Sequence, residues 1–305
     1  MADAEAERAP QRNGYAYPLW RRNDRPLAMD WTGPLYVFDI DNTYLLSEWT
    51  SFRDLLRLRF EAAEDKQPVP GAVELLSGLR RLQPDGERPA FYFVSASPNT
   101  MRGVLEKRML IDGVLHDGIT FRDLNRLRYL RDIFGYKLAA LLLYRLENPR
   151  GVREFLFGDD REHDPLVYSL YTQVCSGALR GEALLAELET QGVRTKAQHY
   201  IVTLADELPA HDPVEWVFIR RLRPGEPSHV EREVELPPRL LFLDDYGEAA
   251  AVLRALDLLN ARAFQEVLRA VRREGMGEHP LRLVEATADH LPPEGRQRVA
   301  EELAP

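Results

Sequence analysis

The stretch "LYVFDIDNTYLL" at residues 35–46 places two aspartates directly after an apolar run. A continuous apolar run is typical of a strand covered on both faces, as in a parallel sheet. Asp39 and Asp41 then lie where the chain leaves the sheet, and both point the same way. Two acids so placed can share a metal ion or divide the roles of nucleophile and acid/base. Acids also commonly end strands and cap helices, so the pair alone leaves a structural role open.

Four further apolar runs end in polar residues, and helical patterns separate them. The runs are "AFYFVS" (90–95), "EFLFGDD" (154–160), "VEWVFIRRL" (214–222) and "RLLFLDD" (239–245), with helices expected at 70–82, 137–146 and 181–192. After residue 245 the pattern is wholly helical and begins with a capping-box sequence, "DYGE". This alternation predicts an α/β fold with a mainly parallel sheet flanked by helices.

The bulk properties restrict the classes of function. The chain has 305 residues and a net charge of -9, which argues against a general nucleic-acid binder. No apolar run approaches the roughly 20 residues of a membrane-spanning helix, and the first thirty residues lack the apolar segment of a secretory signal. With Cys175 as the single cysteine, we expect a cytoplasmic protein without an intrachain disulfide. The oligomeric state stays open.

Three further features accompany the aspartate pair along the chain. Ser95 ends the second apolar run, where a hydroxyl and the following amides can receive a phosphate oxygen, although such a serine also suits a simple turn. Lys137 is expected to open a strongly amphipathic helix in a chain with four lysines, and either offers positive charge to a phosphoryl group or is a solvated residue. The oxygen-rich cluster Asp159, Asp160 and Asp164 suits a hard cation such as magnesium.

In this order the features resemble the four motifs of the haloacid dehalogenase superfamily of phosphohydrolases. More narrowly, "FYFVSASP" (91–98) and the run from "GYKLAALLLYRL" (135–146) through "FLFGDDREHDPLVYSLY" (155–171) look like the catalytic domain of actin-patch-type phosphatidate phosphatases and their bacterial relatives. This resemblance extends over roughly residues 34–222 and implies a Rossmann-like fold and phosphoryl transfer.

The resemblance also implies a role for each motif residue. Asp39 becomes the nucleophile, Asp41 the acid/base and Thr43 a supporting, substrate-binding residue. Mg²⁺ is expected to bind the side chains of Asp39 and Asp159 and the backbone carbonyl of Asp41, with Asp164 as the next ligand.

The transferring phosphoryl group is expected to bind Ser95, Lys137 and the backbone amide of Ala96. The short interval between Thr43 and Ser95 leaves room for a small cap or none, so the site would be open to a large substrate. Seven arginines either line its mouth or lie on solvated helices beside Asp54, Asp123 and Asp132: they are Arg53, Arg57, Arg59, Arg122, Arg126, Arg128 and Arg131.

We interpret residues 1–30 as a tail, 31–258 as a phosphatase domain and 259–305 as a helical extension. The predicted activity is Mg²⁺-dependent hydrolysis of a phosphomonoester, either phosphatidate or another large phosphorylated substrate such as a phosphoprotein or a polynucleotide end. A non-catalytic binding or regulatory protein with the same fold is the alternative from a different class. Asp244 and Asp245 are expected to be structural, and His163 to lie at the surface or behind the site.

Overall fold

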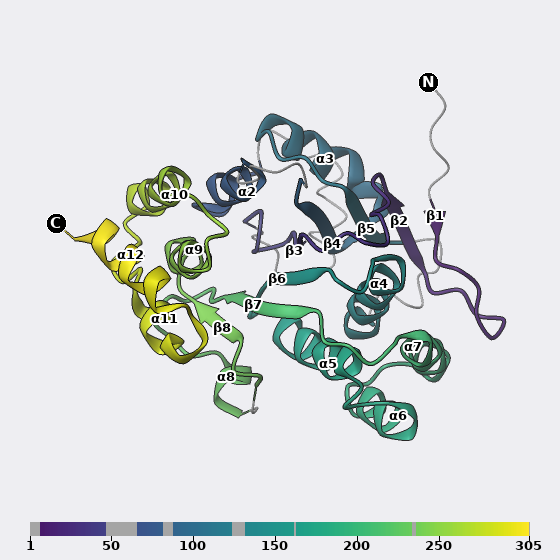
Figure 1. The fold of residues 1–305 in the computed structure, drawn as a ribbon. Helices are drawn as coiled ribbons and strands as arrows, with labels where there is room; N and C mark the ends of the chain where they lie inside the picture. Colours follow the sequence, from purple (N-terminus) through teal and green to yellow (C-terminus); the bar gives the residue numbers. More distant parts are fainter. Residues whose placement is uncertain are drawn as a thin grey trace.

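The computed structural model describes residues 7–46, 66–81, 88–123, 132–161, 163–233 and 236–304. An eight-stranded sheet runs through the middle in the order β1-β2-β5-β4-β3-β6-β7-β8 (Figure 1). The strands are β1 (Glu7–Arg8), β2 (Leu19–Asn23), β3 (Pro34–Asp39), β4 (Ala90–Pro98), β5 (Gly118–Arg122), β6 (Arg153–Asp159), β7 (Val214–Arg220) and β8 (Leu240–Leu243). Neighbours from β5 to β8 pair in parallel, whereas β1 and β2 pair antiparallel at one edge. The predicted α/β fold with a mainly parallel sheet is therefore confirmed.

Helices cover both faces of the sheet (Figure 1). One face packs against α2 (Ala72–Arg81), α3 (Arg102–Ile111), α9 (Tyr246–Ala255) and α10 (Ala261–Arg273). The other packs against α4 (Ile133–Glu147), α5 (Asp164–Ser176), α6 (Gly181–Thr190) and α7 (Thr195–Glu207). The remaining helices are α8 (His229–Glu233), α11 (Arg282–Ala286) and α12 (Pro293–Leu303), with 3-10 helices η3 (Asn99–Met101) and η5 (Ala288–His290).

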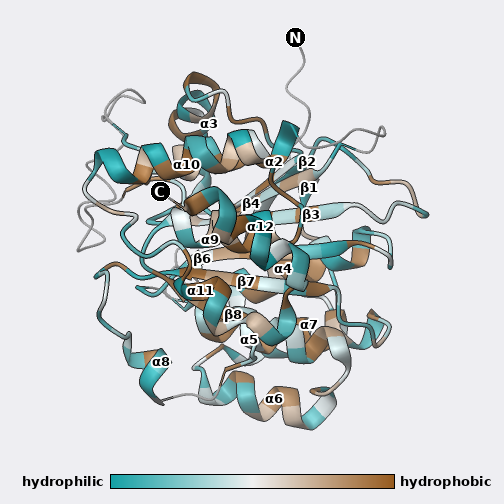
Figure 2. Cartoon of the chain, turned by 60° about the vertical axis from the view of Figure 1, so that its left-hand side comes forward, coloured by the Kyte–Doolittle hydropathy of each residue, from teal (hydrophilic) through white to brown (hydrophobic). Residues whose placement is uncertain are grey.

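The continuous apolar runs form strands because both faces of the sheet are covered. All six residues of β3 are buried. On one face, the ring of Phe38 stacks on that of Phe157 with centroids 4.1 Å apart, and Phe157 stacks on Phe218 at 4.9 Å. Burying each such side chain contributes roughly 1.5–3 kcal/mol. Figure 2 shows hydrophobic segments gathered in the central strands, and alternating hydrophilic and hydrophobic bands along α10, whose apolar residues face the core.

The strand order changes direction at β3. The chain continues from β3 to β4 and β5 on one side of the sheet, and then to β6, β7 and β8 on the other. At such a point the connections leave neighbouring strands toward opposite faces, and the carboxyl ends of the strands leave a crevice where ligands bind. The carboxyl ends of β3 and β6 are neighbours here, so Asp39 and Asp159 are brought to that crevice.

The sequence pattern missed three strands, the two-residue β1 and also β2 and β5. β5 reads "GITFR", too short and polar for an apolar run, and β2 pairs with it antiparallel. Residues 19–23, part of the predicted tail, thus belong to the central sheet. At the other end of the chain, Leu283 and Val299 pack in the same core cluster as Phe38. The boundaries at residues 30 and 258 stay predictions.

The helices expected at 70–82, 137–146 and 181–192 correspond to α2, α4 and α6. At the start of α9, Asp245 caps the helix by accepting a hydrogen bond from the backbone N–H of Gly247 at 2.7 Å. Glu248 accepts from the N–H of Asp244, one residue earlier than a regular capping box would have it. The structural role expected for Asp245 is confirmed. Among the described residues, no helix has both the length and the apolar character that crossing a membrane requires.

Candidate active site at the carboxyl edge of the sheet

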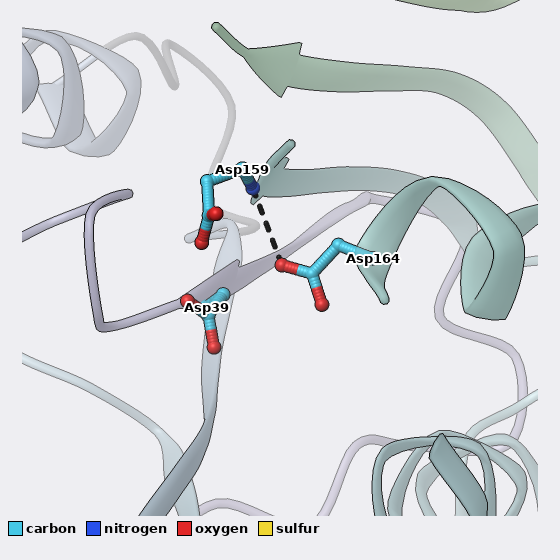
Figure 3. Close-up of side chains that lie close together, drawn as sticks. All are labelled: Asp39, Asp159 and Asp164. Atoms are coloured by element: carbon cyan, nitrogen blue, oxygen red, sulfur yellow. Dashed lines mark hydrogen bonds between the residues drawn. The ribbon is translucent and has the colours of Figure 1, made fainter. Parts of the chain in front are cut away.

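Three carboxylates meet at the carboxyl edge of the sheet (Figure 3). Asp39 ends β3, Asp159 ends β6 and Asp164 begins α5. Each side chain is at most 1% exposed, and one oxygen from each lies within 4.8 Å of the others. The structure thus brings these three acids together, because parallel strands deliver their carboxyl ends to one edge. Their predicted role as metal ligands stays a prediction.

Local sequence explains why α5 starts so close to β6. A Cβ atom at Gly158 would lie only 2.6 Å from Oδ2 of Asp164, so a larger residue would displace this carboxylate. The backbone N–H of Asp159 donates to Oδ2 of Asp164 at 3.2 Å (Figure 3). The N–H of Arg161 donates to Oδ1 of Asp159 at 2.6 Å. Backbone donors thus fix the orientation of two of the three acids.

Lys137 lies among these acids, buried in α4. Its Nζ is 3.0 Å from Oδ1 of Asp39 and 2.5 Å from Oδ1 of Asp164. Lys137 carries one positive charge, and three carboxylates buried this close together repel one another. A set of hard oxygen donors of this kind fits a hard divalent cation such as Mg²⁺.

Asp41 lies outside the three-acid cluster and faces hydroxyl groups instead. Its Oδ2 accepts hydrogen bonds from Oγ of Ser97 at 3.0 Å and from Oγ of Ser95 at 3.3 Å. The backbone N–H of Ser97 also donates to Oγ of Ser95 at 3.0 Å. Ser95 was predicted at this site, whereas Ser97 was not. The metal contact expected from the backbone carbonyl of Asp41 stays a prediction.

A bulge in β4 brings both serines to Asp41. Between the pairs Val94–Thr120 and Pro98–Arg122, four steps along β4 match two steps along β5. The extra residues bend the strand and redirect its side chains, as bulges beside active sites commonly do. The sequence signal for this feature was the Ser-Ala-Ser-Pro pattern at the strand end, since proline cannot continue a ladder in the interior of a sheet.

The turn after β3 is held by two residues far along the chain. Asn42 has φ of 57°, a left-handed conformation that asparagine adopts more readily than most residues. Arg220, at the end of β7, donates from Nη1 to the carbonyl of Asn42 at 2.9 Å. The hydroxyl of Tyr246, the first residue of α9, donates to the carbonyl of Thr43 at 2.7 Å. Neither Arg220 nor Tyr246 was predicted at the site, although an arginine at the end of an apolar run was visible in "VFIRRL".

Two buried tyrosines fix the ends of β4 and β6. The hydroxyl of Tyr136 donates to the carbonyl of Ser95 at 2.7 Å, and that of Tyr168 to the carbonyl of Phe157 at 3.0 Å. Burial raises the pKa of both tyrosines well above its ordinary value, and the negative charge of Asp164 adds to this effect at Tyr168. Both hydroxyls therefore stay protonated and act as donors.

The remaining predicted residues have less direct links to the cluster. Thr43 is buried, and its hydroxyl has no hydrogen-bond partner among the described residues. Ala96 is buried beside the two serines, and the phosphate contact expected from its amide stays a prediction. Asp160 accepts from the N–H of Leu222 at 2.9 Å, and burial raises its pKa. Asp160 therefore ties the segment after β7 to β6.

Of the residues expected around the opening of the site, the structure describes His163 and Arg122. His163 precedes α5, with its ring centroid 6.0 Å from that of Phe134. Arg122 is buried at the end of β5. Most of the candidate cap segment at residues 51–67 lies outside the described residues, which resume at residue 66. Six of the seven arginines do too: Arg53, Arg57, Arg59, Arg126, Arg128 and Arg131.

Comparison with known proteins gives one match. The family model described as "Phosphatidate phosphatase APP1, catalytic domain" matches residues 35–180. This range includes Asp39, Asp41, Ser95, Lys137 and the acidic residues at the end of β6, and it stops before Arg220 and Tyr246. No curated protein and no solved structure matches the chain.

Proposed function

We propose that this protein is a Mg²⁺-dependent phosphatase that hydrolyses a phosphomonoester through an aspartyl-phosphate intermediate. The observation that carries the proposal is the buried cluster of Asp39, Asp159 and Asp164 around Lys137, at the point where the strand order reverses. The match of residues 35–180 to a phosphatidate phosphatase catalytic domain supports phosphoryl chemistry and favours phosphatidate as substrate. The order of the six parallel strands is the one found in doubly wound folds and supports a Rossmann-like fold of the haloacid dehalogenase type.

In this proposal Asp39, Asp159 and Asp164 hold the metal ion. When bound, Mg²⁺ offsets the surplus carboxylate charge and polarises the phosphoryl oxygens. Lys137 supplies the other positive charge of the cluster from within the protein. Both charges favour the approach of a phosphate dianion to a carboxylate that it would otherwise repel.

Asp39 acts as the nucleophile. Its carboxylate oxygen forms a bond to phosphorus while the bond from phosphorus to the leaving oxygen breaks. Asp41 gives its proton to that leaving oxygen. Water then attacks the aspartyl-phosphate, Asp41 takes a proton from the water, and phosphate leaves with Asp39 regenerated. The two acids have different surroundings, as this division of roles requires: Asp39 lies beside an ammonium group and two acids, and Asp41 beside two hydroxyls.

Positioning of the phosphoryl group falls to Ser95, Lys137 and the backbone amide of Ala96. Donors that point at the transferring oxygens stabilise the charge of the transition state, and the loss of one such donor typically costs about 2.7–4 kcal/mol. The hydrogen bonds to the carbonyls of Ser95, Asn42 and Thr43 keep these donors and Asp41 in fixed places before substrate arrives.

A cytoplasmic location remains a prediction.

The test is phosphate release from p-nitrophenyl phosphate and from phosphatidate in detergent micelles, with Mg²⁺ or EDTA. We expect Asp39→Asn to lower Mg²⁺-dependent release at least about 10³-fold, because the amide is not a nucleophile. Asp244→Asn is the matched control. Asp244 also follows a strand at this edge, but its Oδ1 accepts from Arg221 at 2.8 Å and from the N–H of Gly225 at 2.9 Å.

The outcomes separate the hypotheses. Full activity of Asp39→Asn would show that the nucleophile is assigned wrongly. Release from p-nitrophenyl phosphate but not from phosphatidate would favour a different phosphomonoester, such as a phosphoprotein. A folded wild-type protein that binds Mg²⁺ and releases no phosphate from either ester would favour the non-catalytic alternative.

A further inference from the structure

We infer that Ser97 is a positioning residue that orients the carboxyl group of Asp41 for proton transfer to the leaving oxygen. This inference rests on the proposed function, in which Asp41 is the acid/base. It assigns a role to a serine that lies two residues beyond the phosphate-binding serine of the predicted motif.

The geometry gives Asp41 two donors on one oxygen. Ser97 is 4% exposed, and its hydroxyl donates to Oδ2 of Asp41 at 3.0 Å. Ser95 donates to the same oxygen at 3.3 Å. The carboxyl group can rotate about its Cβ–Cγ bond only by giving up both hydrogen bonds. The bulge in β4 that places these two hydroxyls side by side is therefore also what fixes the plane of the carboxyl group.

The two serines differ in whether their hydrogen bond to Asp41 persists once substrate is bound. In the proposed mechanism Ser95 turns its hydroxyl toward a phosphoryl oxygen, and its hydrogen bond to Asp41 is already the longer of the two. Ser97 then remains as the hydroxyl donor to Asp41. Its backbone N–H meanwhile donates to Oγ of Ser95 at 3.0 Å, which helps to aim the Ser95 hydroxyl. Ser97 thus acts through its neighbours rather than on the substrate.

This role predicts that the loss of kcat/KM caused by replacing Ser97 depends on the leaving group of the ester. An alkoxide leaves poorly and needs the proton from Asp41, whereas p-nitrophenolate is a stable anion that leaves without one. The ratio kcat/KM measures the barrier from free enzyme and substrate to the first committed transition state, in which the leaving group departs. Misorientation of Asp41 should therefore lower kcat/KM for an alkyl ester far more than for an aryl ester.

The experiment compares Ser97→Ala with the wild type on short-chain phosphatidate, phenyl phosphate and p-nitrophenyl phosphate. General acid catalysis is worth about 10²–10⁴-fold, so we expect misalignment to lower kcat/KM for the alkyl ester about tenfold or more. The loss should shrink in the order alkyl, phenyl, p-nitrophenyl. An equal loss for all three esters, or none, would overturn the inference.

Two further measurements separate positioning of Asp41 from binding of phosphate. In the Asp41→Asn background, Ser97→Ala should cause no further leaving-group-dependent loss, because the group through which it acts has gone. Inhibition by inorganic phosphate should weaken in Ser95→Ala but stay near the wild-type value in Ser97→Ala. Equal weakening in both variants would make Ser97 a phosphate-binding residue instead.

The same data distinguish failure of this inference from failure of the proposed function. If Asp41→Asn shows a strong leaving-group effect and Ser97→Ala does not, the acid/base role of Asp41 stands and the role of Ser97 is wrong. If the wild-type protein hydrolyses none of the esters, the proposed function fails, and the role of Ser97 with it.

Discussion

Strand β6 and helix α4 carry buried charges near both of their ends, α5 contributes a polar residue to each group, and the two groups differ in charge balance. At the amino edge of the sheet, Nη1 of Arg145 lies 3.0 Å from Oε1 of Glu154, and the hydroxyl of Tyr171 donates to Oε2 of Glu154 at 2.7 Å. Arg145 also donates to the carbonyl of Asn148 at 3.0 Å. One cation there meets one anion, and neutral groups satisfy their remaining hydrogen-bonding capacity.

At the carboxyl edge, Lys137 of α4 contacts Asp164 of α5 and Asp39 of β3, and Asp159 of β6 lies in the same cluster of acids. A buried charge-matched pair can hold three elements in register. A buried cluster with surplus negative charge works against folding until a cation binds. Charge imbalance, rather than burial or charge alone, therefore distinguishes the candidate active site from a structural ion pair.

Of the substitutions that separate the two edges, the one at the carboxyl edge should reduce activity most. Asp159→Asn removes one of three mutually repelling carboxylates and one proposed metal ligand. We expect Mg²⁺-dependent phosphate release to fall at least about 10²-fold. In EDTA the free energy of unfolding should rise by about 1 kcal/mol, because repulsion is relieved. Urea unfolding with EDTA and with Mg²⁺ measures the second effect, and lower stability of the variant in EDTA would contradict it.

At the amino edge of the sheet, we expect a substitution to lower stability and leave activity unchanged. Glu154→Gln leaves the guanidinium of Arg145 buried without its carboxylate, which typically costs about 3–5 kcal/mol of stability. Because Glu154 lies at the far edge of the sheet from Asp159, kcat/KM of the folded variant should not change. Urea unfolding and phosphate release test both statements. The double variant Arg145→Met with Glu154→Gln should recover part of the lost stability, since no buried charge remains unmatched.

A smaller effect, also on the amino-edge side, depends on pH. Burial, with a contribution from Arg22, lowers the pKa of His116 from 6.5 to about 4. The unfolded chain therefore binds a proton at a higher pH than the folded one. Stability is full above about pH 6.5 and falls as the pH drops toward about 4, by on the order of 2–3 kcal/mol in total.

Urea unfolding across this pH range, compared between the wild type and His116→Gln, measures that contribution. The variant should show a shallower loss of stability between pH 6.5 and 4. If the two curves keep the same slope, His116 is not the group responsible. Nδ1 of His116 lies 3.9 Å from Oδ2 of Asp24, and its Nε2 lies 3.7 Å from Oε1 of Glu106. Because His116 is not part of the cluster of Asp39, Asp159 and Asp164, the activity of the folded protein should not follow this titration.

Much of the candidate site was predictable because its signals are local. Asp39 and Asp159 each end an apolar run, and strands covered on both faces are continuous in hydropathy. Lys137 lies in the otherwise mostly apolar sequence of α4, so its charge was conspicuous. The strands that were missed lack this signal: β5 is short, and β2 alternates between buried and half-buried residues as the antiparallel neighbour of β5.

The residues that the pattern analysis missed act across long intervals of sequence. Ser97 reaches Asp41 over 56 positions, Arg220 reaches Asn42 over 178, and Tyr246 reaches Thr43 over 203. Two of these three contacts come from beyond the segment that matches the family model. No hydropathy period or spacing rule relates residues so far apart, so their proximity appears only when the sheet is assembled.

The class of fold, and the acids, serine and lysine at the carboxyl edge, could be predicted from the amino-acid sequence, because apolar runs mark strands and polar residues mark where they end. The folded structure was needed to show that Lys137 contacts two of the three carboxylates, that two serines bind Asp41, and that β7 and α9 hold the turn after β3. Hydropathy is a property of neighbouring residues, whereas charge balance and side-chain direction depend on which distant elements pack together.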